Sequence, residues 1–274
     1  MGVETKPSFE NIETSPWGDF ELAEGVTGHW RVGPLHLWVS NLEHEWRVAY
    51  LQEDDPLESA LNVAIPAQAL PPEEATSLRF GFGKTGTGLT LEPVLADRSV
   101  VVKPEVPLYV PSGEEATLYV STPVWVRVSL KKTGTLLELP SYRPSDTWFG
   151  SSTVAGEFCY ASRTAGRLSL DELEFRPHRA VTPVCVRNRA DNPLLWERVK
   201  LPVQYLAVYR AESRFLWTQQ VTLEREEDGD LAGLVIAKNV PKEVGRAVRM
   251  SEPRQHADKN LVVRAFSKLF KEDV

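Results

Sequence analysis

The residues with the most capacity for chemistry gather in the middle of the chain. From Ser141 to Arg163, regular strand alternation gives way to hydroxyls, glycines, charges and aromatic rings, and a second basic group follows in Phe175-Arg-Pro-His-Arg-Ala180. Arginine presents a planar fork that suits carboxylate or phosphate, and a neighbouring ring offers a stacking face. We expect a ligand-binding surface for a small anionic or sugar-like molecule, formed by Arg143, Asp146, Trp148, Glu157, Tyr160, Arg163, Arg176, His178 and Arg179.

The same residues permit a purely structural interpretation, in which the arginines pair with acidic neighbours and the rings complete a core. No catalytic residue is assigned, because nothing fixes the separation or environment of Asp146 and Glu157. Gly81-Phe-Gly-Lys-Thr-Gly-Thr-Gly88 contains the Gly-Lys-Thr of a phosphate loop, but Leu78 stands where the leading glycine belongs and a strand follows. This stretch therefore predicts a glycine-rich hairpin. Gly150-Ser-Ser152 lacks the closing glycine of a nucleophile elbow, since Val154 stands there.

Three histidines, His29, His36 and His44, fall in successive predicted strands. Neighbouring strands lie about 5 Å apart, so these imidazoles could approach one another. Their spacing is loose and no His-x-His pair occurs. We therefore predict surface or interface histidines, no metal site and no cofactor, and stoichiometric zinc would overturn this view.

Composition limits the classes of function. The chain has 274 residues, of which 42% are hydrophobic, and a net charge of −7. Nucleic acid is an improbable partner for such an acidic chain, because gripping its backbone needs concentrated Lys and Arg. No window of about 18 apolar residues predicts a transmembrane segment. The two cysteines, Cys159 and Cys185, are too few for a disulfide framework, and we expect buried thiols in a cytoplasmic protein.

Strand signals dominate the chain. Apolar and polar residues alternate at 35–39, 46–50, 124–128 and 184–186, and turn residues separate these runs. This period of two predicts an all-β protein of antiparallel sandwich or barrel type. The only amphipathic helix that we expect runs from about Asp258 to Lys271, with Leu261, Ala265 and Phe266 on its apolar stripe.

Two features suggest protein partners or self-association. Among eight tryptophans, Trp38 and Trp125 lie at the polar positions of their strands, where an exposed ring could anchor an interface. The alternative is that a second layer covers both faces of the sheet. The terminal helix could dock on a partner or an anionic membrane surface, or it could pack against a sheet.

The strand pattern also predicts two packed halves. We place the boundary near Pro140, so that residues 1–139 form an N-terminal sandwich-like half and residues 140–274 a C-terminal one carrying the helix. A strand ending at Asn188, a polar turn and a new strand from Pro193 resemble immunoglobulin-like domains. The two halves could equally share one larger core.

Several segments support a family resemblance. These are Leu108–Val120, Thr122-Pro-Val-Trp-Val126, Thr147-Trp-Phe-Gly-Ser-Ser-Thr153 and Glu157-Phe-Cys-Tyr160. Together they resemble an archaeal and bacterial family known as domain of unknown function 432. The resemblance implies a mostly β, cytosolic protein and supplies no mechanism.

The sequence thus favours a noncatalytic cytoplasmic binding or regulatory module. One alternative is an enzyme or sensor for a small anionic or sugar-like ligand at the central region. The other is a subunit of a larger protein assembly.

Overall fold

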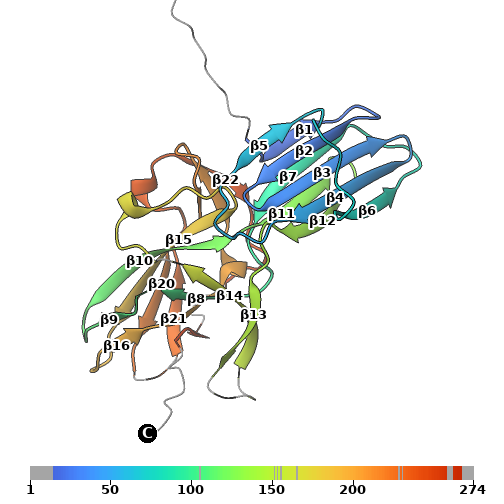
Figure 1. Cartoon of the computed structure of the whole chain (residues 1–274). Helices are drawn as coiled ribbons and strands as arrows, with labels where there is room; N and C mark the ends of the chain where they lie inside the picture. Colours follow the sequence, from blue (N-terminus) through green and yellow to red (C-terminus); the bar gives the residue numbers. More distant parts are fainter. Residues whose placement is uncertain are drawn as a thin grey trace, which may run out of the picture.

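The computed structural model describes residues 15–104, 106–150, 152, 154, 156–164, 166–227, 229, 231–257 and 262–266, with only the backbone of Arg163 and Thr164. Strands dominate this part of the chain (Figure 1). Its helices are three single turns of 3-10 type, η1 (Leu170–Glu172), η2 (Val203–Tyr205) and η3 (Lys242–Val244). Among the described residues, none of these turns has the length or apolar character to cross a bilayer. The all-β prediction is confirmed.

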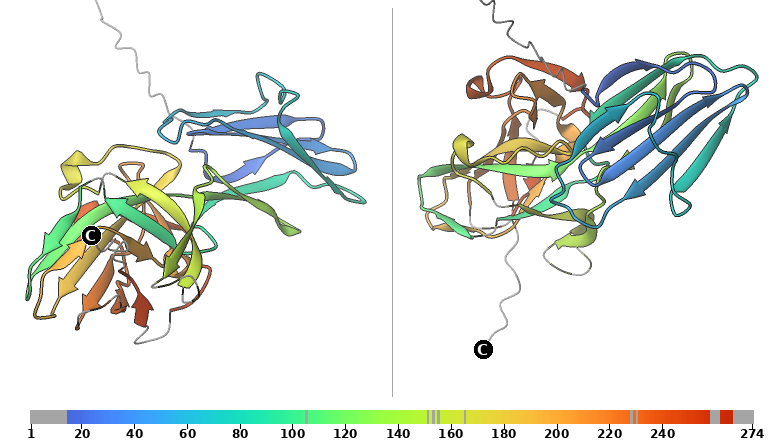
Figure 2. Two further views of the ribbon diagram at one scale, coloured as in Figure 1. Left: turned by 60° about the horizontal axis from the view of Figure 1, so that its bottom comes forward. Right: turned by 45° about the horizontal axis from the view of Figure 1, so that its top comes forward.

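Two facing sheets form the first sandwich. One sheet has the order β5-β2-β3-β4-β6, with bounds Leu61–Ala64, Thr27–Val32, Leu35–Leu42, Glu45–Gln52 and Thr76–Gly81. The other has the order β1-β7-β11-β12, with bounds Gly18–Glu21, Gly88–Val94, Trp125–Leu130 and Gly134–Pro140. Figure 2 shows these two layers facing each other.

Alternation along the strands explains the core of the first sandwich. Trp30 lies opposite Leu37 on the neighbouring strand, Val39 lies opposite Val48, and all four are buried. Phe20 of the opposite sheet contacts the Trp30 ring edge-on, with 5.1 Å between centroids. Each such side chain removes apolar surface from water, which contributes roughly 1.5–3 kcal/mol.

The second body contains the remaining three sheets. The largest has the order β22-β18-β19-β15-β20-β21-β23, with β10 also pairing with β15, and bounds Ala247–Ser251, Val208–Ala211, Leu216–Trp217, Arg179–Asn188, Val221–Arg225, Leu231–Ile236, Val262–Arg264 and Glu115–Pro123. The second has the order β13-β14-β8-β17, with bounds Ser145–Gly150, Gly156–Thr164, Val100–Pro104 and Val199–Leu201. The third pairs β16 (Leu194–Trp196) with β9 (Leu108–Val110).

Two of the three sheets of the second body are mixed, which corrects the purely antiparallel prediction. Strand β15 pairs in parallel with β19 and β20, and β14 pairs in parallel with β8. Parallel neighbours need long connections. Between β8 and β14 the chain provides such a connection, because it passes through β11 and β12 of the first sandwich. The alternation of apolar and polar residues within one strand does not reveal a connection of this kind.

The two bodies are joined by one nearly continuous strand path. Strand β10 belongs to the second body, β11 belongs to the first, and only Val124 separates them. The Val124 amide donates to His178 O at 2.9 Å, and the Ser141 amide donates to Val124 O at 3.0 Å. Strands β8, β9 and β10 thus precede Pro140 in sequence but pair with strands that follow it. The boundary near Pro140 itself stays a prediction.

The C-terminal helix prediction is wrong where the structure describes it. Val262–Arg264 forms the edge strand β23 beside β21, and Phe266 bridges to Val199. Residues 258–261 and 267–271 lie outside the described residues. Short isolated helices are marginal in water. The unpaired edge of β21 instead gives this segment backbone partners, and Ala265 and Phe266 are buried there.

Two smaller expectations also change. The glycine-rich stretch 81–88 is not a hairpin, because β6 and β7 lie in different sheets of the first sandwich and the stretch crosses between them. Seven tryptophans are buried, and the eighth, Trp148, is partly exposed. The Trp38 indole donates to Ala69 O at 3.1 Å, and Trp125 packs 5.4 Å from the Tyr160 ring. Trp38 and Trp125 are thus covered, which is the alternative that the sequence left open, and they offer no exposed ring to a partner.

Gly33, in the two-residue turn between β2 and β3, tests how closely the bodies pack. It has a φ of +58°, and a Cβ there would overlap the His178 ring. Gly25 has a φ of +80° with open space around it, so it reports the backbone effect alone. We expect Gly25→Ala to lower the free energy of unfolding by about 1–2 kcal/mol, and Gly33→Ala by about 1–3 kcal/mol more because of the overlap. Urea unfolding measures both, and equal losses would contradict the close packing.

Candidate functional site

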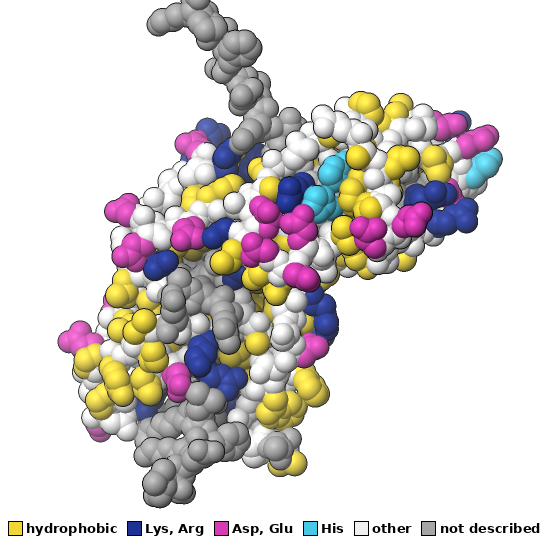
Figure 3. All heavy atoms as spheres, viewed as in Figure 1, with side chains coloured by type: hydrophobic (Ala, Val, Ile, Leu, Met, Phe, Trp, Pro, Cys, Tyr) yellow, Lys and Arg dark blue, Asp and Glu magenta, His cyan; other side chains and the backbone are white. Residues whose placement is uncertain are grey.

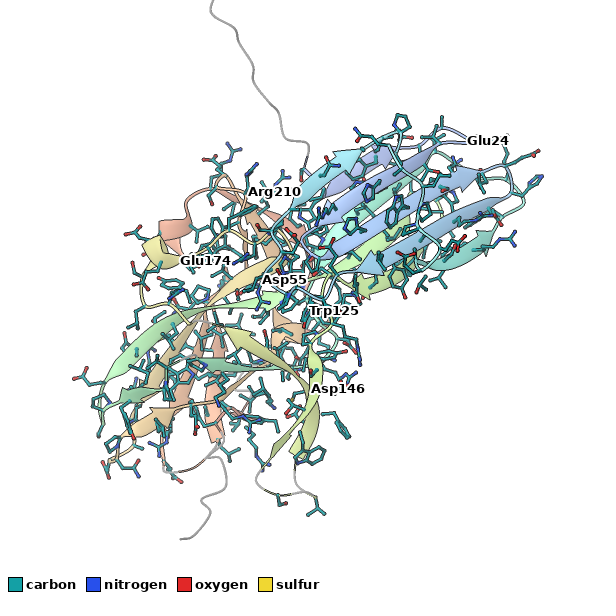
Figure 4. The ribbon with its side chains drawn as sticks, viewed as in Figure 1. Glu24, Asp55, Trp125, Asp146, Glu174 and Arg210 are labelled. Carbon is teal, nitrogen blue, oxygen red and sulfur yellow. The ribbon has the colours of Figure 1, made fainter. Side chains whose placement is uncertain are left out.

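A cleft of about 860 Å³ lies in the second body at its boundary with the first sandwich. Strands β8 and β14 form one wall, and β10 and β15 form the other. The segment from Gly166 to Arg176 and the loop at Pro56 and Leu57 complete it. In Figure 4, the labels Asp55, Glu174 and Asp146 mark the chain segments that surround this region.

Basic side chains predominate in the cleft, although the chain as a whole carries a net charge of −7. Two carboxylates, Glu172 and Glu174, line it together with five cations, Lys103, Arg167, Arg176, Arg179 and Arg198. Among the described residues, Arg176 is the one cation of this set that has a carboxylate within 4 Å, at 2.7 Å from Glu174. The cleft therefore carries positive charge that the described part of the protein does not neutralise.

Arg179 is the most buried of these cations, with 9% of its surface exposed. Its Nε donates to Ser121 Oγ at 3.0 Å, and its Nη2 donates to Ser162 Oγ at 3.1 Å and to Ser121 O. Within the described part of the chain, Nη1 has no hydrogen-bond partner. Burial, and then the charge of Arg176, lowers the pKa of Arg179 to about 10, so the group stays protonated at neutral pH.

Arg176 lies close to Arg179 and ties the cleft to the first sandwich. Its Nη1 donates to Leu57 O, and its Nη2 donates to Glu174. Leu57 belongs to the connection between β4 and β5, so this contact joins the two bodies at the rim. Two guanidinium groups that face one cavity repel each other, and an anion between them would relieve the repulsion.

His178 supports the wall of the cleft from behind and does not line it. Its ring is fully buried, and its Nε2 lies 3.1 Å from Pro56 O. Burial, and then the neighbouring Arg179 charge, lowers its pKa to about 4. The imidazole is therefore neutral at physiological pH, and its Nε2–H donates to the Pro56 carbonyl.

The predicted site residues separate into distinct groups. Arg176 and Arg179 line the cleft, whereas Arg143, Asp146 and Tyr160 form a neighbouring ion-pair cluster. Arg143 and Arg98 donate to the Asp146 carboxylate at 3.0 and 3.3 Å. The Tyr160 hydroxyl donates to Asp97 at 3.0 Å and accepts from Arg98 at 3.1 Å. The charges of Arg98 and Arg143 balance those of Asp97 and Asp146. This is the arrangement that the structural interpretation expects, in which arginines pair with acidic neighbours.

Trp148 and Glu157 lie on the β13–β14 hairpin away from the cleft. The Trp148 indole donates to Ser152 O at 2.8 Å and meets the Phe158 ring edge-on at 5.2 Å. The Glu157 carboxylate accepts a hydrogen bond from the ammonium group of Lys200, whose side chain is only 7% exposed. The Arg163 side chain lies outside the described residues.

Sequence reasoning missed Lys103, Arg167 and Arg198 as cleft residues. They come from β8, from the turn before η1, and from the segment between β16 and β17. Lys103 does interrupt the apolar run Val100–Val102, which is the one local sign of a special position. Pairing between distant strands brings the three together, and no local pattern reports that pairing.

The histidines of the first sandwich behave differently from one another. His29 and His36 meet, with their rings 5.4 Å apart between centroids, and His29 also stacks on Trp38 at 4.5 Å. Burial, and then the neighbouring His36, lowers the pKa of His29. His44 lies apart from them, with 69% of its side chain exposed, and contacts Gly83 O at 3.2 Å.

Comparison with known proteins gives one result. A family model described as a protein of unknown function (DUF432) matches residues 16–271. The searches of curated proteins and of solved structures returned no match.

The lowered pKa of His178 predicts a specific pH dependence of stability. Its folded-state pKa of about 4 lies below the unfolded value of 6.5, so the unfolded chain binds a proton first as the pH falls. The stability that the folded protein gains by keeping His178 neutral is fully present above pH 6.5. It is lost as the pH falls from 6.5 to 4, and the free energy of unfolding decreases by about 3 kcal/mol in total.

His178→Gln keeps an N–H donor for Pro56 O but does not titrate. We therefore expect the wild type to lose more stability than this variant across that window, as measured by urea unfolding at several pH values. Parallel stability curves for the two proteins would show that His178 is not held neutral by burial.

Proposed function

Since the chain belongs to the DUF432 family, whose model assigns no function, we propose from its cleft that it is a noncatalytic binding module for a small organic anion. The ligand would bear a phosphate or carboxylate group and bind between β8, β14, β10 and β15. The observation that supports this most directly is Arg179, a buried guanidinium without a carboxylate partner among the described residues.

The energetic argument concerns the cost of burying charge. A buried cation is tolerated when hydrogen bonds or a counter-charge compensate for its lost hydration. Two serine residues supply hydrogen bonds to Arg179 but no negative charge. A bound anion would supply that charge, and a hydrogen bond to a charged group contributes about 1.5–3 kcal/mol.

The size and lining of the cleft support a small ligand. About 860 Å³ lies within the range of small-molecule sites. Tyr119 and Tyr142 also line it and offer rings to an organic portion of the ligand. Phosphate and carboxylate fit the guanidinium fork better than an uncharged sugar does, so a sugar-like ligand is the second choice.

Binding is favoured over catalysis by the kind of side chains present. In the described lining, the groups are cations, serines, tyrosines and two glutamates, and both glutamates are exposed. Catalytic carboxyl groups usually lie where water is excluded, whereas these two lie in contact with solvent. We extend the proposal to a cytoplasmic location, which the free and buried thiols of Cys159 and Cys185 support. The immunoglobulin-like relationship of the two halves stays a prediction on which this function does not depend.

Assembly into a larger complex is a second candidate, supported by the β13–β14 hairpin. Phe158 is 65% exposed and Val154 is 91% exposed, although both are apolar. Exposed apolar side chains that gather at one place mark interaction sites more often than scattered ones do. This hairpin, and not the tryptophans expected from the sequence, would then make the contact.

Arg179→Met tests the binding function. We expect phosphate, pyrophosphate or citrate to raise the melting temperature of the wild type, because a ligand selective for the folded state stabilises it. Loss of one charge-assisted hydrogen bond should weaken binding of that anion by about 10- to 100-fold. Arg189→Met is the matched control, since Arg189 is 57% exposed and pairs with Glu226 outside the cleft.

Lys103→Met provides a second cleft variant, and because the Lys103 side chain is exposed we expect the variant to fold as the wild type does. It should weaken binding of the same anion by a smaller factor. If none of the three anions shifts the wild-type melting temperature, or if Arg189→Met weakens binding as much as Arg179→Met, the cleft is not the anion site.

Phe158→Ser tests the assembly candidate. Sedimentation velocity should show concentration-dependent self-association of the wild type and a shift to monomer in this variant. Leu231→Ser is the control, because Leu231 is 55% exposed on a different strand. If the wild type is monomeric at every concentration, the hypothesis that this hairpin mediates self-association is wrong.

A further inference from the structure

Two histidines on the outer face of the first sandwich point ring nitrogens at each other. Nε2 of His29, on β2, lies 3.3 Å from Nδ1 of His36, on β3. Both residues belong to the central strands of the five-stranded sheet. Figure 3 shows histidine side chains on this face beside acidic and basic ones.

The other nitrogen of His36 is held by a carboxylate. His36 Nε2 lies 2.9 Å from Glu53 Oε1. The carboxylate accepts, so Nε2 carries the proton and Nδ1 presents its lone pair toward His29. Metal-binding histidines commonly donate their second N–H to a carboxylate in this way, which fixes the ring and raises its basicity.

We propose that His29 and His36 chelate a divalent transition metal ion of the Zn²⁺, Ni²⁺ or Cu²⁺ class, with Glu53 orienting His36. A hydrogen bond of 3.3 Å is long for two nitrogens. A zinc ion bonds to imidazole nitrogen at about 2.05 Å, and two nitrogens at this spacing then subtend about 107° at the metal, close to the tetrahedral angle. The ion takes the place of the hydrogen between the rings, and the single proton of neutral His29 moves from Nε2 to Nδ1, which is the other tautomer of the ring.

The surrounding groups hold this pair in place. The His29 ring stacks on Trp38, which a hydrogen bond to Ala69 O fixes. Arg31 binds Glu53 at 3.1 Å and Glu58 at 3.2 Å. Arg31 thereby holds the Glu53 carboxylate that orients His36.

Within the described part of the chain, no group of three or more His, Cys, Asp or Glu side chains is arranged to hold a metal. The protein therefore supplies two ligands, His29 and His36. Water molecules would complete the coordination. Imidazole suits zinc, copper and nickel, whereas magnesium and calcium prefer oxygen ligands. The site should therefore discriminate against magnesium and calcium.

Calorimetric titration of the full chain with Zn²⁺ and with Mg²⁺ tests the proposal. We expect one Zn²⁺ per chain and no Mg²⁺ binding. His29→Gln and His36→Gln should each abolish Zn²⁺ binding, while His44→Gln, which removes an exposed histidine of the same sheet, should bind as the wild type does. Glu53→Gln should weaken binding by about tenfold or more.

Titration of the wild type followed by NMR of the histidine rings covers the case in which a variant does not fold. Zn²⁺ should shift the ring signals of His29 and His36 and leave those of His44 unchanged. The proposal is wrong if the wild type binds no Zn²⁺, if either histidine variant binds it normally, or if His44→Gln removes the binding. None of these results bears on the anion cleft, which shares no residue with this site.

Discussion

The rest of the structure depends on the hydrogen bonds that fix the passage of the chain between its two bodies at Val124. Strand β10 ends in one sheet and β11 begins in another, and Val124 between them exchanges backbone hydrogen bonds with Ser141 and His178. The Ser141 hydroxyl adds a bond to Val124 O at 2.6 Å. Because all three residues are buried, water cannot compete for these bonds.

This junction determines where the cleft forms. Fixing β11 in the first sandwich places the loop at Pro56 and Leu57 against His178 and Arg176. The neutral His178 ring occupies the space that a Cβ at Gly33 would need, so the two bodies are in direct contact behind the wall. Arg179, the next residue, is held by the same strand, and its charge is buried at the boundary.

The central region combines binding and structural roles that a list of residue types does not separate. Arg143 and Asp146 neutralise each other beside Tyr160, whereas Arg176 and Arg179 face one cavity. All four are charged residues near turns or strand ends in the sequence. Both Arg143 and Arg176 have an acidic partner close in sequence, Asp146 and Glu174. Among the described residues Arg179 has none, and only the packing of β10, β14 and β15 around it buries that unpaired charge.

The sequence by itself determined the class of fold, the strands at 35–39, 46–50, 125–128 and 184–186 and the burial of both cysteines, because these follow from alternation and composition along short segments. The family followed from the resemblance of several short segments. It also placed Arg176 and Arg179 among the candidates, since basic residues near aromatic rings are visible locally. Only the tertiary structure decided that β8 pairs with β14, that 262–264 forms a strand, and that Lys103 and Arg198 share a cleft with Arg179. Those outcomes depend on which distant strand edges remain open for pairing, and such pairing is a property of the whole chain.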